Sequence, residues 1–138
     1  MKISTRGRYG LRLLVDIAEQ VTDGPIALST VAERQQLSEK YLQQVALLLA
    51  RGGIFTSVKG SGGGYYLAKR PEEIVMYDVL DLLEGNIAFE EDPPQNETAV
   101  QQVIRLHFYR TIDQKVRAAF GSLNLAEIVK ADWFSYEI

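Results

Sequence analysis

Cysteine is absent from the 138-residue chain, and its one histidine is His107. Without cysteine the protein cannot form a disulfide, a thiolate nucleophile, a zinc–thiolate site or a cysteine-ligated iron–sulfur cluster. A single imidazole removes most histidine metal sites, and no pair of acids flanks a recognisable pocket. The sequence therefore predicts a protein that holds no metal or cofactor and is not an enzyme.

Long hydrophobic runs are missing as well. No apolar stretch reaches the roughly 18 residues that a membrane-spanning helix requires. The N-terminal segment lacks the apolar core of a signal peptide. We therefore expect a cytoplasmic protein without a membrane partner, long enough for one domain with a core and an appendage.

Basic residues are scarce in the second half of the chain. Residues 1–70 hold ten Lys and Arg against five Asp and Glu, a net charge of +5, whereas residues 71–138 hold five against thirteen, a net charge of −8. A basic half is typical of a module that meets a polyanion with one face. The other interpretation is that solvated charges are segregated by chance.

Three helices are predicted in the first half of the chain. Their apolar residues recur at helical spacing over residues 5–20, 28–35 and 39–51. The connection 36–38 is short, and Ser38 is placed to cap the third helix. This succession predicts a helix-turn-helix motif.

A β-hairpin is predicted next. Residues 54–58 and 65–68 have the composition of short strands, and a basic, glycine-rich turn lies between them. Such a hairpin beside a helix-turn-helix is typical of a wing. We therefore predict a mainly α fold with a small β-hairpin, in which residues 1–70 form a winged helix-turn-helix domain.

The rest of the chain is expected to form two parts. Residues 71–96 hold a connecting helix, from Pro71 to Glu84, and an acidic loop whose charge is interpreted as solvated, with a cation site as the alternative. Residues 97–138 hold a long helix over 97–120 and a C-terminal segment.

The long helix carries an apolar residue at every fourth position. Its apolar surface is too wide for a small domain to cover, so we expect it to pair with a second copy of the chain. His107 lies on this helix and is expected at the interface or the surface. The expected dimerisation residues are Val100, Ile104, Phe108, Ile112 and Val116.

The helix-turn-helix and the wing together predict binding to double-stranded DNA. The second helix of such a motif enters the major groove, where Gln suits adenine, and Lys suits guanine or a phosphate. Ser38 at a helix N-terminus can receive a phosphate, and the glycines of the turn allow close backbone approach. The outward positions are Ser38, Lys40, Tyr41, Gln43 and Gln44, with Lys59 and the glycines at 60, 62, 63 and 64 on the wing.

Other interpretations remain open at this point. The helix pair could serve packing alone, and Tyr41 could lie at the edge of the core. The glycine-rich turn could cradle a nucleotide phosphate, although it lacks the P-loop order and lies between strands. The long helix could belong to a scaffold protein that binds no DNA.

Three stretches carry a resemblance to a known family. Residues 2–10 (KISTRGRYG), 37–44 (LSEKYLQQ) and 60–65 (GSGGGY) resemble the signature of the Rrf family of bacterial winged-helix regulators. Residues 78–85 and 123–128 extend the likeness over nearly the whole chain. The resemblance implies a homodimeric transcription regulator, expected to be a repressor, that binds a roughly palindromic operator. It implies DNA contacts by Thr5, Arg6, Arg8, Ser38, Lys40, Tyr41, Gln43, Gln44, Lys59, Gly60, Ser61, Gly62 and Gly63.

One loop departs from the pattern of the family's cluster-binding members. Those members carry three cysteines before the long helix, whereas residues 90–96 (EEDPPQN) hold none. The chain looks most like the branch of cysteine-metabolism repressors, whose loop is also acidic and free of cysteine. That likeness implies control of sulfur genes through a partner, cysteine synthase, which responds to O-acetylserine. The alternative is a different small-molecule effector bound between the winged domain and the long helix.

The C-terminal residues suggest how such a partner would bind. Cysteine synthases resemble one another in accepting a partner's C-terminal isoleucine in the active site. We hypothesise that Tyr136, Glu137 and Ile138 enter that site. The other interpretation is a C-terminus that is packed at the dimer interface through Trp133 and Phe134.

Overall fold

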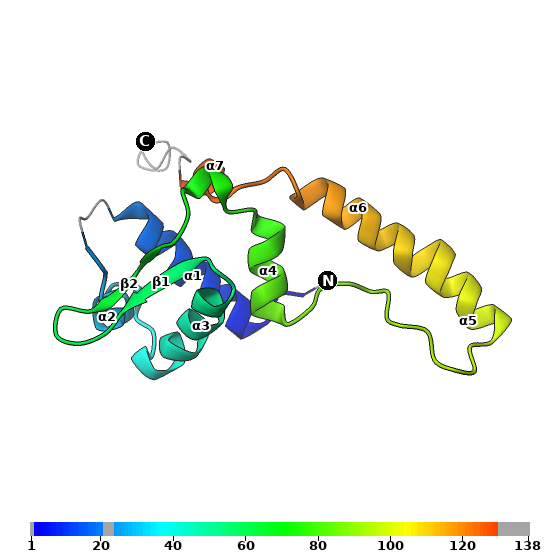
Figure 1. Cartoon of the computed structure of the whole chain (residues 1–138), viewed down its shortest axis with the longest axis horizontal. Helices are drawn as coiled ribbons and strands as arrows, with labels where there is room; N and C mark the ends of the chain where they lie inside the picture. The colour runs from blue at the N-terminus through cyan, green and yellow to red at the C-terminus, as the bar shows by residue number, and fades with distance from the viewer. Residues whose placement is uncertain (1, 21–23, 130–138) are drawn as a thin grey trace.

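Three helices near the N-terminus pack around one apolar core (Figure 1). The computed structural model describes residues 2–20 and 24–129. Ser4 begins the first helix, because its Oγ accepts a hydrogen bond from the Gly7 amide at 3.0 Å. The three helices predicted from the sequence are confirmed as α1 (Thr5–Glu19), α2 (Leu28–Gln35) and α3 (Glu39–Arg51).

The turn between α2 and α3 is closed by backbone and side-chain caps. Gln36 adopts the left-handed conformation, with φ 56° and ψ 47°. This allows the Leu37 amide to donate to the carbonyl of Ala32 at 2.9 Å. Ser38 Oγ then accepts from the Tyr41 amide at 3.3 Å and starts α3. The helix-turn-helix geometry is therefore set largely by local contacts.

The predicted hairpin is present. β1 (Phe55–Val58) pairs antiparallel with β2 (Gly64–Leu67), and Phe55 lies opposite Leu67. Ile26, before α2, adds a bridge to Tyr65 through hydrogen bonds of 2.8 and 2.9 Å. This bridge attaches the base of the wing to the segment that leads into α2.

The connecting helix expected from Pro71 to Glu84 is interrupted. The structure has a 3-10 turn, η1 (Pro71–Glu73), and then α4 (Met76–Glu84). Between them the backbone is extended, because Leu125 donates to the Ile74 carbonyl and Met76 donates to the Leu123 carbonyl, each at 2.9 Å. Pairing with a distant segment replaces one turn of helix there.

The buried core continues past residue 70. Ile74, Val79 and Leu83 belong to the same cluster as the residues of α1 and α3. α7 (Leu125–Val129) returns from the far end of the chain and buries Leu125 completely. The winged domain is therefore completed by segments on both sides of the long helix.

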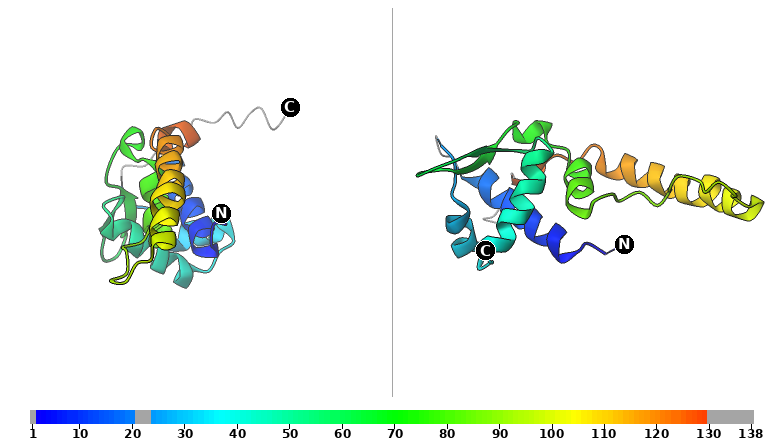
Figure 2. Two further views of the ribbon diagram at one scale, coloured as in Figure 1. Left: turned by 90° about the vertical axis from the view of Figure 1, so that its right-hand side faces the viewer. Right: turned by 60° about the horizontal axis from the view of Figure 1, so that its bottom comes forward.

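The long helix projects from the winged domain as an arm (Figures 1 and 2). Its expected range of 97–120 agrees with the structure, although a wide turn divides it. Thr98 caps its start, and residues 86–98 run back along it. Its three consecutive parts are α5 (Ala99–Ile104), η2 (Arg105–Tyr109), which is a π turn, and α6 (Arg110–Phe120).

Within residues 2–20 and 24–129, no helix has both the length and the apolar character needed to cross a membrane.

Candidate nucleic-acid interface

The first turns of α3 present polar side chains to solvent. Lys40, Gln43 and Gln44 are exposed, whereas Leu42 and Val45 are fully buried. The helical period separates the two sets, since positions three and four residues apart share a face. In a helix-turn-helix, the corresponding face of the second helix is the one that meets base edges.

Tyr41 is half-buried and joins α3 to α1. Its ring meets Tyr9 edge to face, with centroids 5.4 Å apart and planes at 81°. Such a contact adds stability beyond the area buried. Tyr41 therefore holds the start of α3 in place, while Ser38 beside it stays exposed at the helix N-terminus.

The wing and α3 form the two sides of one open groove of about 570 Å³. Gln43 lines it from α3, and Lys59, Gly60 and Gly63 line it from the hairpin. Lys59, Gly60, Ser61 and Gly62 are exposed, and Gly63 is half-buried. The structure thus brings together residues that the sequence placed on two separate motifs.

Ser29 also lines this groove and is not among the residues predicted from the sequence. It is the second residue of α2 and is exposed. A hydroxyl in the first turn of a helix is a common phosphate-binding position. Its place at the start of the first helix of the motif was the signal that could have identified it.

The N-terminal residues Thr5, Arg6 and Arg8 are exposed on the first turn of α1. Arg6 Nε donates to the Leu83 carbonyl at 2.6 Å, at the C-terminal end of α4. Arg8 Nε donates to the Ile3 carbonyl at 3.2 Å. The two arginines therefore also have structural contacts, and a cation at the end of α4 complements the helix dipole.

A buried carboxylate links α1 to the helix-turn-helix. Asp16 is 4% exposed. It accepts from Arg34 at 2.6 and 3.1 Å and from Gln35 Nε2 at 2.8 Å. The hydrogen bond with Asp16 raises the pKa of the Arg34 guanidinium. These contacts hold the C-terminal turn of α2 against α1.

Replacing Asp16 with alanine is expected to lower the free energy of unfolding by about 2–3 kcal/mol. The loss arises because Arg34 and Gln35 lose a shared, charged acceptor. Urea unfolding followed by circular dichroism measures it. Glu19→Ala, an exposed acid on the same helix, is the matched control and should change stability by less than about 0.5 kcal/mol. Equal effects of the two variants would show that the buried pair adds nothing.

The apolar stripe of the long helix is exposed at its outer end. The side chains of Val100, Ile104 and Phe108 are 69%, 39% and 57% exposed, whereas Ile112 and Val116 are half-buried. A soluble monomer rarely leaves such a stripe open to water. His107 lies among these residues and is exposed.

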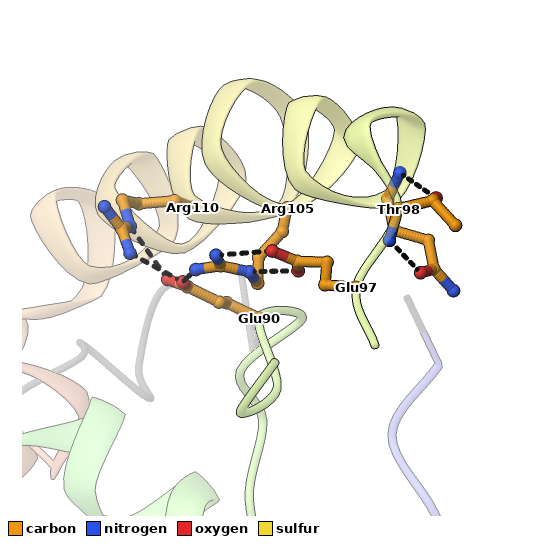
Figure 3. A network of polar contacts seen from close by, with 6 residues as sticks. Glu90, Glu97, Thr98, Arg105 and Arg110 are labelled. Atoms are coloured by element: carbon orange, nitrogen blue, oxygen red, sulfur yellow. Dashed lines mark hydrogen bonds and ion pairs between the residues drawn. The ribbon is translucent and has the colours of Figure 1, made fainter. Parts of the chain in front are cut away.

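The acidic loop is bound to the long helix by ion pairs (Figure 3). Glu90 accepts from Arg110 at 2.8 and 3.0 Å and from Arg105 at 3.1 Å. Glu97 accepts from Arg105 at 2.7 and 2.9 Å. Arg110 lowers the pKa of Glu90, and Arg105 lowers the pKa of Glu97. The interpretation of solvated loop charge is therefore wrong for Glu90, because Arg105 and Arg110 of the helix pair with it.

The residues of the proposed partner site, Tyr136, Glu137 and Ile138, lie outside the described part of the chain, as do Trp133 and Phe134. Their proposed contact with a synthase remains a hypothesis.

Comparisons with known proteins cover most of the chain. A family model described as "Rrf2: Iron-dependent Transcriptional regulator" matches residues 3–131. The HTH-type transcriptional regulator CymR of Bacillus subtilis is 41% identical over 88 residues, which are 64% of this chain and 64% of CymR. Protein rrf2 of Nitratidesulfovibrio vulgaris is 36% identical over 134 residues, which are 94% of this chain and 88% of that protein.

The description of the family model names iron, and the residues of this chain do not fit an iron–sulfur cluster. The chain has no cysteine to supply thiolate ligands. Glu90 and Glu97 of the loop are already paired with arginines. Among the described residues, no group of three His, Asp or Glu side chains could hold a metal ion.

Solved structures agree with the sequence comparisons. A transcriptional regulator from Listeria innocua superposes with a TM-score of 0.75 at 36% identity and covers 96% of this chain and 88% of its own. CymR, described as the global cysteine regulator of B. subtilis, superposes with a TM-score of 0.73 at 32% identity and covers 96% of this chain and 98% of its own. With a winged helix-turn-helix and a match to transcriptional regulators over nearly all of its length, the chain belongs to the Rrf2 family of DNA-binding transcriptional regulators.

Proposed function

We propose that this regulator binds its operator as a homodimer and represses genes of cysteine or sulfur metabolism. The observation that carries the DNA contact is the groove between α3 and the wing, lined by Gln43, Lys59 and the glycines of the hairpin turn. The likeness to CymR, a cysteine regulator by its description, supports the metabolic assignment. The absence of cysteine supports control without a cluster.

The exposed stripe of the long helix supports the dimer. Val100, Ile104 and Phe108 together would be removed from water by a second copy. A two-fold dimer presents two copies of α3 to DNA, so its operator would be roughly palindromic, with half-sites about one helical turn apart.

Within the interface we propose two kinds of residue. Gln43 and Gln44 carry amides suited to base edges. Lys40 and Lys59 carry compact charges suited to phosphates, and Ser38 offers a phosphate the N-terminal end of α3. Thr5, Arg6, Arg8, Tyr41, Gly60, Ser61, Gly62 and Gly63 are proposed to contact or position the backbone of the DNA.

The two kinds of residue should respond differently to alanine. Lys59→Ala is expected to weaken binding to every DNA sequence and to reduce the salt slope by about 1. Gln44→Ala is expected to relax preference at one base pair, at a cost of about 1–3 kcal/mol. Fluorescence anisotropy with an operator, its single-base variants and random DNA measures both effects. Identical responses of the two variants would contradict the division.

The control of this repressor is proposed to run through cysteine synthase, as the likeness to cysteine-metabolism repressors implies. Binding to a promoter of a cysteine-synthesis gene should tighten when the synthase is added and weaken again with O-acetylserine. Tight binding that is unaffected by the synthase and by O-acetylserine would support the assignment as a transcription regulator. It would also indicate that the regulator responds to another effector. The absence of specific binding at any salt concentration would favour a scaffold role for the long helix.

A small-molecule effector is the second candidate, favoured by one observation. A cavity of about 380 Å³ lies between α4 and α6, lined by Leu80, Ile87, Val116 and Phe120. Its size is within the range of ligand pockets, and it lies where the winged domain meets the arm. Metabolites that change the melting temperature of the protein without the synthase would support this candidate.

A further inference from the structure

The π turn in the long helix has one residue more than a regular turn. The Arg110 amide donates to the carbonyl of Arg105, five residues back rather than four. Such turns account for less than about 1% of residues in proteins and frequently mark functional sites. Arg105, its first residue, and Arg110, which follows it, are the two arginines that bind the acidic loop.

The extra residue allows both arginines to reach one carboxylate. In a regular α-helix, side chains five residues apart point about 140° apart. One additional residue in a turn reduces the angle between these two side chains by about 100°, to about 40°. Glu90 Oε2 accordingly accepts from Arg105 Nη1 at 3.1 Å and from Arg110 Nη2 at 2.8 Å (Figure 3).

The loop is also held through its backbone. The Asp113 carboxylate accepts from the amides of Phe89 and Glu90 at 2.7 and 2.9 Å. Phe89 stacks on Tyr109, with centroids 6.5 Å apart. Glu90 is therefore fixed at the position where it meets both arginines, and the π turn is favoured by contacts from outside the helix.

The same turn decides where the apolar stripe points. A repeat of four residues advances about 40° at each step in a regular helix, so Val100 and Val116 would lie about 160° apart. The π turn lies between them and reduces this angle to about 60°. The stripe that the sequence shows thus lies along one side of the helix only when the π turn is present.

We propose that Glu90, Arg105 and Arg110 are positioning residues for the dimer. By holding the π turn, the loop aligns the outer half of the stripe with its inner half. Loss of the Glu90 contacts lets the turn return to a regular helix and rotates Val100 and Ile104 by about 100° relative to Val116. This inference rests on the proposed homodimer, because the apolar stripe is the surface through which the two copies would contact each other.

The first test is a charge-removing substitution in the full chain. Glu90→Gln is expected to raise the dimer dissociation constant, measured by sedimentation equilibrium, about tenfold or more. Arg110→Ala should act in the same direction. Glu91→Gln, at an exposed neighbouring position, is the matched control and should leave the constant unchanged. Circular dichroism checks that each variant is folded.

The second test removes the extra residue. Deleting His107, which is exposed in the π turn, leaves a regular helix in which Val100 and Val116 are about 60° apart without any help from the loop. The deletion variant should dimerise, and adding Glu90→Gln to it should have no effect. Leu106 offers a second deletion with the same expectation.

The outcomes separate the two proposals. Weakening by Glu90→Gln in the natural chain, but not in the deletion variant, supports the inference. A dimeric natural chain that tolerates Glu90→Gln, or equal weakening in both backgrounds, overturns the inference alone. A natural chain that is monomeric at high concentration overturns the proposed dimer, and the inference with it.

Discussion

Replacing Phe108 with aspartate is expected to disrupt the proposed dimer, leaving the protein monomeric, and to lower operator affinity by a factor of about 100 or more. Phe108 lies near the middle of the exposed stripe, with 57% of its surface open to water. Burial of one such ring contributes about 1.5–3 kcal/mol. In a two-fold symmetric interface each copy contributes its own Phe108, so the ring is buried twice. Two carboxylates in place of the rings would add a desolvation cost.

Sedimentation velocity measures the loss of the dimer, and fluorescence anisotropy with a palindromic operator measures the loss of affinity. Gln102→Asp is the matched control, because it adds the same charge at an exposed position two residues from Val100, on the opposite side of the helix. A Phe108→Asp variant that stays dimeric would place the dimer seam elsewhere.

Replacing Gly64 with alanine is expected to lower the free energy of unfolding by about 3 kcal/mol and the melting temperature by about 10 °C. Gly64 has a φ of +155°, and an added Cβ would lie well inside 3.0 Å of the Ile26 carbonyl oxygen. The obstacle is backbone, so no side-chain rotation relieves it. The two hydrogen bonds between Ile26 and Tyr65 would have to break.

Thermal unfolding by circular dichroism measures this effect. Gly62→Ala separates backbone crowding from conformational strain, because Gly62 has a φ of +76° in the same hairpin but nothing within 4 Å of an added Cβ. It should cost about 1 kcal/mol. If the two substitutions cost the same, the contact with Ile26 does not limit position 64.

Local sequence signals accounted for most of the winged domain. The spacing of apolar residues in α1, α2 and α3 and the cap at Ser38 are properties of short stretches, and the structure has them where they were expected. The outward positions on α3 followed from the same spacing, since Lys40 and Gln44 are outward whenever Leu42 is inward. The groove between α3 and the wing could not be derived in this way, because it depends on how two motifs pack.

Two features of the structure could not be predicted from short stretches of the sequence. Ile74 and Val75 leave the helix expected there, because they pair with residues about 50 positions later in the chain. Glu90 was interpreted as solvated, because its partners Arg105 and Arg110 are brought to it only when the chain folds back along the arm.

The composition and short-range pattern of this chain excluded thiolate chemistry and specified the helices, the hairpin and the four-residue apolar repeat. Those properties depend on residue type and on neighbours within a turn or two. The interruption of the connecting helix, the groove that Ser29 shares with the wing and the direction of the apolar repeat depend on contacts between segments far apart in sequence. Such contacts form only between packed elements, so the tertiary arrangement sets the course of the groove between α3 and the wing and the alignment of the stripe on the arm.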